Sequence, residues 1–108
     1  YILLLTLKAG EYTGSRVSDV DLLRIRNAMP HLAETLKKSL RPGDAVAQFS
    51  DSQYVILLSA CTYEGGMLAA NRIISKFYQD HKVYRNLKIK IHIEKVKTAE
   101  HILNKYSG

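Results

Sequence analysis

The pattern of apolar and polar positions divides the chain into alternating strands and helices. Residues 1–7 (YILLLTL) are almost continuously apolar, which predicts a central strand with both faces covered. Between residues 18 and 40, apolar side chains recur every three or four positions, which predicts a helix. Pro30 lies inside it, so the segment is one kinked helix or two, and the unbroken apolar phase favours one. The apolar positions are Leu22, Ile25, Met29, Leu32, Leu36 and Leu40.

Two further strands are predicted around a polar turn. Residues 45–49 (AVAQF) make a short strand, and residues 54–58 (YVILL) form an apolar run that is too short for a helix. We interpret the second run as a strand buried on both faces. The four residues between them, SDSQ, suit a hairpin because Asp and Ser side chains bond their own backbone.

The second half of the chain repeats the order of helix and strand. Thr62 can cap a helix over residues 63–79, with Arg72 outside its apolar face. Residues 87–94 alternate Leu or Ile with polar side chains, which predicts a half-buried strand with a basic wet face. A short terminal helix is expected over residues 98–106. This order of elements predicts an α+β fold, with helices packed on a mainly antiparallel sheet.

Length and composition predict a single domain. The 108 residues suffice for one core, and 46% hydrophobic content excludes a disordered chain. The chain begins in mid-strand without Met, so we expect residues 1–108 to be one domain excised from a larger protein. No apolar run is long enough to span a bilayer. The single cysteine, Cys61, favours a reducing cytoplasmic setting.

The charge of the chain does not predict nucleic-acid binding. The net charge is +6, but the lysines and arginines are dispersed over several predicted elements. Direct nucleic-acid binding is therefore not expected, although two or three of these residues would suffice to attract a small anion. No metal site or cofactor is predicted either, because His31, His81 and His101 have no acidic or cysteine partner at recognised ligand spacing.

A motif surrounds the predicted hairpin. Arg41-Pro-Gly-Asp44 is followed by A-V-A-Q-F and then by Ser50-Asp51-Ser52-Gln53-Tyr54. This order resembles GGDEF domains, the bacterial diguanylate cyclase family, in which an R-x-x-D pair precedes a hairpin carrying the signature. The spacing matches without a gap, but the signature does not. Both glycines are replaced, by Ser50 and Asp51, and the acidic pair has become Ser52 and Gln53.

The chain is identified as a degenerate GGDEF domain, similar to those attached to bacterial transcriptional activators. The resemblance covers residues 2–97 and implies a ferredoxin-like βαββαβ sandwich of the nucleotide-cyclase type. Active relatives carry a metal-binding Asp near the end of the first strand, where Thr6 stands here. Since this carboxylate, the glycines and the signature acid are all lost, we expect no enzymatic activity.

The resemblance also implies a ligand site. In the family, the R-x-x-D pair and an arginine on the following helix bind cyclic di-GMP, and these roles fall on Arg41, Asp44 and Arg72. Arginine forks suit phosphates and guanine edges, and a carboxylate can accept from guanine N–H groups. Two observations oppose this interpretation. Arg16 and Asp19 have the same spacing by chance, and Pro-Gly inside the pair is typical of a plain turn.

Two main hypotheses of function follow from the resemblance. The first is a catalytically inactive regulatory or interaction domain of a bacterial signalling or transcriptional regulator, whose partners are other domains of the same polypeptide. The second is a cyclic di-GMP receptor that uses the retained R-x-x-D site. A residual enzyme acting on GTP is the least favoured alternative.

Overall fold

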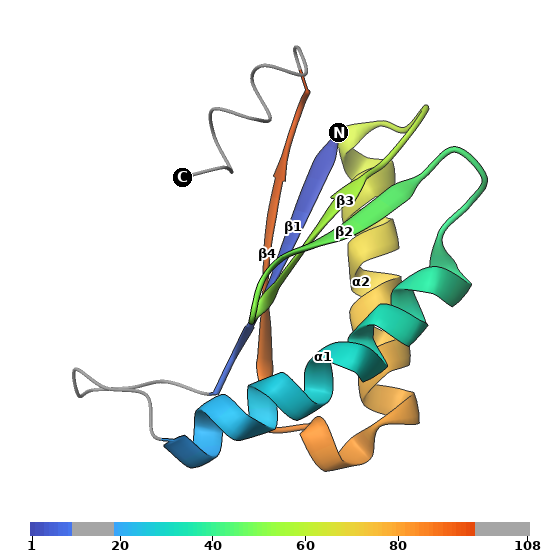
Figure 1. Ribbon diagram of the computed structural model, residues 1–108. Helices are drawn as coiled ribbons and strands as arrows, with labels where there is room; N and C mark the ends of the chain where they lie inside the picture. Colours follow the sequence, from blue (N-terminus) through green and yellow to red (C-terminus); the bar gives the residue numbers. More distant parts are fainter. Residues whose placement is uncertain (10–18, 97–108) are drawn as a thin grey trace.

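The computed structural model describes residues 1–9 and 19–96 (Figure 1). The elements are β1 (Ile2–Lys8), α1 (Asp19–Ser39), β2 (Ala45–Ser50), β3 (Gln53–Leu57), α2 (Tyr63–Asp80), the 3-10 helix η1 (Lys82–Tyr84) and β4 (Lys88–Glu94). The strands form one antiparallel sheet in the order β2-β3-β1-β4. The predicted α+β class, with helices packed on an antiparallel sheet, is confirmed.

The core lies on the face of the sheet that both helices cover (Figure 1). Register brings Leu3 opposite Ile56 and Leu5 opposite Tyr54, so these side chains form rows beneath the helices. The core comprises Leu3, Leu5, Leu7, Tyr54, Ile56, Leu58 and Leu87, with Ile25, Ala28, Met29, Leu32 and Leu36 of α1 and Ala70, Ile73 and Phe77 of α2. Burial of these apolar side chains is the main source of stability for a domain of this size.

The other face of the sheet is only partly covered, which corrects the prediction for β3. Tyr54 and Ile56 are buried, but Val55 is half-buried and Leu57 is 41% exposed. An apolar run of strand length indicates a strand, but it does not show that helices cover both sides. β1 is central as predicted, between β3 and β4, yet its Leu4 and Thr6 are also only half-buried.

α1 is one helix that runs through Pro30, as the continuous apolar phase predicted. Ile25, Met29, Leu32 and Leu36 of the predicted face are buried. Leu22 is an exception, since it is 52% exposed. The first turn of α1 lies beyond the ends of the strands, so no sheet residue can cover it (Figure 1).

α2 begins as predicted, with Thr62 accepting a hydrogen bond from the backbone amide of Gly65 at 3.0 Å. Gly66 is buried in the first turn, where a Cβ atom would lie 2.5 Å from Cδ1 of Ile93. The missing side chain therefore lets the start of α2 lie close against β4.

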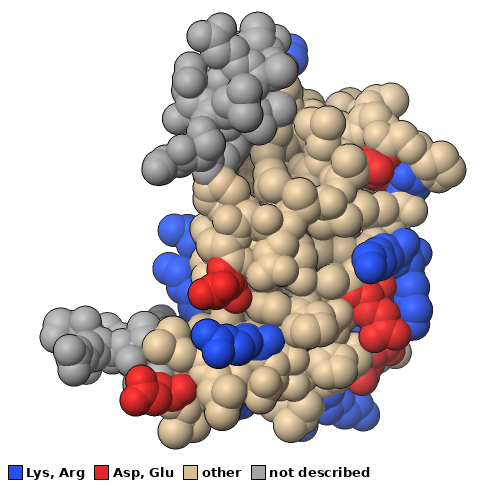
Figure 2. All heavy atoms as spheres, in the orientation of Figure 1, with Lys and Arg blue, Asp and Glu red and all other residues tan. Residues whose placement is uncertain are grey.

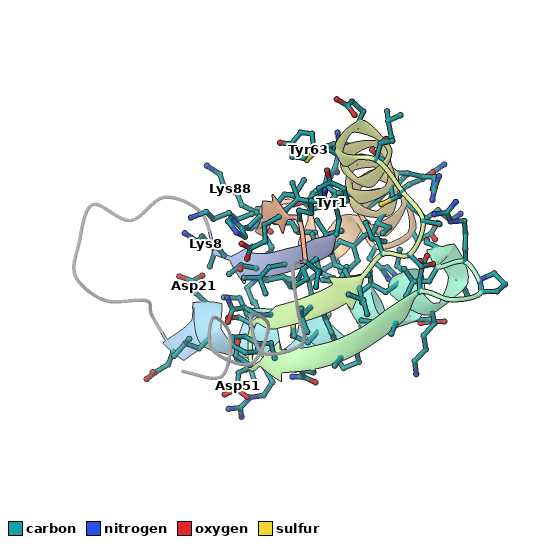
Figure 3. The ribbon with its side chains drawn as sticks, turned by 90° about the horizontal axis from the view of Figure 1, so that it is seen from above. Tyr1, Lys8, Asp21, Asp51, Tyr63 and Lys88 are labelled. Atoms are coloured by element: carbon teal, nitrogen blue, oxygen red, sulfur yellow. The ribbon has the colours of Figure 1, made fainter. Side chains whose placement is uncertain are left out.

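β4 has the predicted alternation. Ile89, Ile91 and Ile93 are half-buried and pack against the core, while Lys88 and Lys90 are exposed on the other side. Lys88 pairs in register with Lys8 of β1, at the end of the sheet labelled in Figure 3. The basic wet face of this strand is thus confirmed.

Within residues 1–9 and 19–96, no helix is long and apolar enough to cross a membrane. The predicted helix at 98–106 lies outside the described residues.

Ile56→Asp is expected to unfold the domain. Ile56 has no exposed surface, and an unpaired carboxylate in an apolar core costs several kcal/mol, about the whole stability of a small domain. Circular dichroism during heating checks this. Leu57→Asp is the matched control, because the neighbouring side chain faces away from the helices and should leave a cooperative transition. A cooperative melt of Ile56→Asp near the wild-type temperature would contradict the described core.

Candidate functional site

An open pocket of about 360 Å³ lies where α1 ends, β2 begins, β3 ends and α2 begins. Arg41, Asp44 and Arg72, the three residues singled out by the R-x-x-D interpretation, all line it. The remaining lining residues are Ser39, Leu40, Leu58, Ala60, Cys61, Thr62, Gly65, Ala69 and Ile73. We call this site the arginine pocket.

The R-P-G-D stretch at its rim is a tight turn. The amide of Asp44 donates to the carbonyl of Arg41 at 3.0 Å, and Gly43 has φ of +95°. Proline followed by a residue with positive φ is the signature of a type II turn, which favours glycine at that position. A Cβ atom on Gly43 would also lie 2.9 Å from the Ser59 hydroxyl. The turn conformation of the backbone is therefore enough to explain why proline and glycine occupy this stretch.

Asp44 points inward rather than into the pocket opening. Its side chain is 3% exposed. Oδ1 accepts from the amide of Ser59 at 2.9 Å and from the Ser59 hydroxyl at 3.2 Å, and Oδ2 accepts from the amide of Arg41 at 3.0 Å. The carboxylate thus ties the start of β2 to the end of β3. Its oxygens are already engaged, so its role here is to hold the pocket wall.

The same contacts set the acidity of Asp44. Burial by itself would raise the pKa of this carboxyl, but the hydrogen bonds from Ser59 and Arg41 and the positive charge of Arg41 outweigh it. The pKa is therefore lowered from its ordinary value of 3.8. Asp44 is ionised at neutral pH and forms a fixed negative group beside Arg41.

The two arginines differ in how they are held. Arg41 has its Nε 3.9 Å from Oδ2 of Asp44 and donates from Nη2 to the carbonyl of Ser59 at 3.2 Å. Arg72 is exposed on α2, as predicted, and has no hydrogen bond or ion pair with any described residue. Since Asp44 balances one positive charge, the pocket keeps the other for an anion.

The start of α2 adds to this positive character. Thr62 and Gly65 line the pocket, so the amino-terminal end of the helix opens into it. The amides of Gly65 and Gly66 are already bonded to Thr62, and the helix dipole at this end favours negative charge. The arginine pocket is chemically suited to a phosphate or carboxylate group.

The hairpin of residues 50–54, which the resemblance compares with the family signature, lies at the other end of β2. Asp51 and Ser52 form its tip, and the hairpin is confirmed, with a bulge between Gln48 and Ser50. Figure 3 shows Asp51 towards the end of the sheet that carries Lys8, with Tyr1 and Tyr63 towards the opposite end.

Hydrogen bonds within the hairpin engage its polar side chains. The Ser50 hydroxyl donates to Oε1 of Gln53 at 2.8 Å and accepts from the amide of Ser52 at 3.3 Å. Nε2 of Gln53 donates to the hydroxyl of Thr6 at 3.1 Å. Thr6 and Gln53 are also register partners on β1 and β3. Two positions that the resemblance assigns to carboxylates are thus neighbours joined by a neutral hydrogen bond.

Tyr54, the last residue of the signature stretch, is part of the core. It is 6% exposed, and its hydroxyl donates to the carbonyl of Met29 at 2.9 Å, which links β3 to α1. Burial raises the pKa of Tyr54, so the phenol remains a donor at neutral pH.

Charged side chains do not gather on the face drawn in Figure 2. Lysine and arginine alternate with acidic groups around a broad area without charge. This distribution agrees with the dispersed charges of the sequence.

Sequence reasoning missed a second cluster. His31, Glu34 and His81 lie together beside α1 and the end of α2. The spacing of three residues between His31 and Glu34 on a predicted helix was a visible signal. The approach of His81 depends on how the two helices cross and has no signal in the sequence.

Comparisons of the chain with protein-family models, with curated proteins and with solved structures find no match.

Asp44→Asn is expected to destabilise the protein by about 1–3 kcal/mol at pH 7, because an amide NH₂ would face a backbone donor in a buried site. Folding lowers the pKa of Asp44, so its contribution is present above pH 3.8 and is lost as the pH falls below it. The difference from wild type should therefore shrink in acid. Urea denaturation at pH 7 and at pH 3 measures both effects.

Asp51→Asn is the matched control for this substitution. Asp51 is exposed at the hairpin tip, so its change should alter stability by less than about 0.5 kcal/mol. Equal effects of the two substitutions, or a difference at position 44 that does not depend on pH, would contradict the role of Asp44.

Proposed function

We propose that this chain is a catalytically inactive GGDEF-like domain that acts as a regulatory or interaction module within a larger bacterial signalling or transcriptional regulator. The observation that carries the proposal is the hydrogen bond between Thr6 and Gln53. In the resemblance, both positions belong to carboxylates of the catalytic site, and here they are neutral, adjacent and bonded to each other.

The connectivity supports the family resemblance. We propose that the fold is the ferredoxin-like βαββαβ sandwich of nucleotide cyclases. β1-α1-β2 and β3-α2-β4 are two split crossovers, each with one strand of the other unit between its own strands. The order β2-β3-β1-β4 with antiparallel neighbours is what such interleaving produces.

The chemistry of phosphoryl transfer explains why the hairpin counts against catalysis. The reaction depends on positioned metal ions and phosphate contacts, and Mg²⁺ is held by carboxylates together with the substrate phosphates. Thr6 and Gln53 supply no negative charge. Ser50 and Asp51 also replace the glycines that would allow phosphates to approach the backbone, and the Ser50 side chain is bonded inside the hairpin. Metal binding and phosphate binding are therefore lost together.

Incubation of the purified chain with GTP and either Mg²⁺ or Mn²⁺ should yield no cyclic di-GMP above a heat-inactivated sample. The reason is the missing carboxylate pair at Thr6 and Gln53. Chromatography of the nucleotides after prolonged incubation measures this. Product that accumulates in proportion to enzyme concentration would disprove the inactive assignment.

A second candidate function is a receptor for cyclic di-GMP, and the arginine pocket favours it. Small-molecule sites have volumes of about 300–1,000 Å³, and this pocket of about 360 Å³ is large enough for one nucleotide half of the ligand. Arg72 would grip a phosphate or guanine edge, with Arg41 beside it. Asp44 would act by holding Arg41 and the turn, since its own oxygens are engaged.

For this candidate, Arg72→Ala should weaken cyclic di-GMP binding by about 10–100-fold, since a charge-assisted hydrogen bond contributes about 1.5–3 kcal/mol. Isothermal titration calorimetry measures the affinity. Arg26→Ala is the control, because Arg26 is an exposed arginine of α1 that does not line the pocket. Wild-type protein that shows no binding at millimolar ligand would eliminate the receptor function and leave the inactive regulatory module in place.

A further inference from the structure

A group of metal-ligating side chains lies where α1 crosses the carboxyl end of α2. His31 and Glu34 are one turn apart on α1 and therefore project from the same side of that helix. His81 caps the end of α2 and is fixed by its amide, which donates to the carbonyl of Phe77 at 2.9 Å. We call these three residues the histidine cluster.

The donor atoms of the histidine cluster are already close. One ligand atom from each residue lies within 4.8 Å of the other two. Two ligands at 2.0–2.1 Å from a tetrahedral zinc ion are about 3.4 Å apart. The three groups can therefore reach a common ion by small side-chain rotations, without movement of either helix.

Aromatic neighbours orient the two imidazoles. The centroid of the His31 ring lies 4.7 Å from the centroid of the His81 ring and 5.7 Å from that of the Tyr84 ring. The ring of His81 also packs 5.5 Å from Phe77, which is fully buried. Among the described residues, neither imidazole takes part in a side-chain hydrogen bond or ion pair. A nitrogen of each ring therefore remains available as a ligand.

The surrounding charges oppose a cation only weakly. Glu34 lies in a cavity of about 300 Å³ with His81, Asp80 and two lysines. Nζ of Lys38 lies 3.6 Å from Oε1 of Glu34, and Nζ of Lys76 lies 3.5 Å from Oδ2 of Asp80. Both pairs are exposed, and exposed ion pairs contribute little, so a divalent ion can displace Lys38 from Glu34. Asp80 adds a second carboxylate near the site.

The end of α2 adds a further attraction for a cation. The last turn of a helix carries partial negative charge and is commonly balanced by basic side chains. α2 has no basic residue in its last turn. A positive ion held by His81, directly at the end of the helix, would supply that balance.

We propose that His31, Glu34 and His81 bind a divalent transition-metal ion, with Zn²⁺ as the expected occupant. Imidazole suits zinc, copper and nickel, whereas magnesium and calcium prefer oxygen ligands throughout. Three protein ligands leave a fourth position for water. The ion links α1 to the junction of α2 and η1, and this binding is independent of the regulatory function proposed above.

The proposal is tested on untagged 108-residue protein that has been freed of metal with a chelator. Calorimetric titration with Zn²⁺ should show one site per chain, and titration with Mg²⁺ should show none. At 100 times the dissociation constant, zinc should raise the folding equilibrium constant about 100-fold. The melting temperature should then rise by about 10 °C. Co²⁺ in place of Zn²⁺ should give the visible absorption of a tetrahedral site.

Substitutions assign the ligands. His31→Gln, His81→Gln and Glu34→Gln should each weaken zinc binding by more than about tenfold, since loss of even an indirect partner of a metal ligand costs that much. Glu34 is exposed, so Glu34→Gln remains decisive if a histidine variant fails to fold. His92→Gln and Cys61→Ser are matched controls outside the cluster and should bind zinc as wild type does.

Two results would overturn the proposal. One is that 100 µM zinc produces neither heat of binding nor a shift in melting temperature. This concentration is about a hundred times a dissociation constant of 1 µM. The other is a loss of affinity in His92→Gln or Cys61→Ser as large as that in Glu34→Gln, which would place the ion elsewhere.

Discussion

The packing of both helices on one face of the sheet is the constraint on which the rest of this structure depends. The two crossovers place α1 and α2 on the same face, so a single core must be shared by both helices and by the inward side chains of the strands (Figure 1). Ile56 and Phe77, both without exposed surface, lie within this core. Because the helices cross over it, hollows form where one helix runs past an end of the other. The arginine pocket and the histidine cluster both lie at such places.

Polar groups at the edges of this core are mostly satisfied by one another. Asp44 is bonded to Ser59 and to the amide of Arg41, and Gln53 is bonded to Ser50 and Thr6. A buried polar group without a partner costs about 1–3 kcal/mol, so each network stabilises the turn that contains it. The networks also limit chemistry. A carboxylate with three short hydrogen bonds has little capacity left for a ligand, and this is why Asp44 differs in role from the exposed Arg72.

Much of the fold could be predicted from the sequence because local patterns determine it. The alternation of Ile89 and Ile91 with lysines, the cap at Thr62 and the helix through Pro30 each depend on neighbours along the chain, and each is found in the structure. The prediction failed for the outward face of β3, because the burial of that face depends on elements that are distant along the chain. Among the described residues, no helix covers the outward side of Leu57, and the apolar run around it gives no sign of this.

The candidate sites show the same difference between features that local sequence patterns determine and features that depend on distant contacts. The family resemblance assigned Arg41, Asp44 and Arg72 to one site, and the structure brings all three to one pocket. The resemblance did not show that Asp44 turns inward, since that depends on Ser59, which lies 15 residues further along the chain. His81 reaches His31 across the helix crossing, and no local pattern records that approach.

The polarity of α2 accounts for the character of both sites. Its amino-terminal end opens into the arginine pocket, where the helix dipole and Arg72 favour an anion. Its carboxyl end carries His81 and no basic residue in the last turn, so partial negative charge there favours a cation. Opposite ligand charges at the two ends therefore follow from one helix. The first turn of α2 lies close against the sheet at Gly66 and Ile93, and both ends of the helix face solvent-accessible hollows.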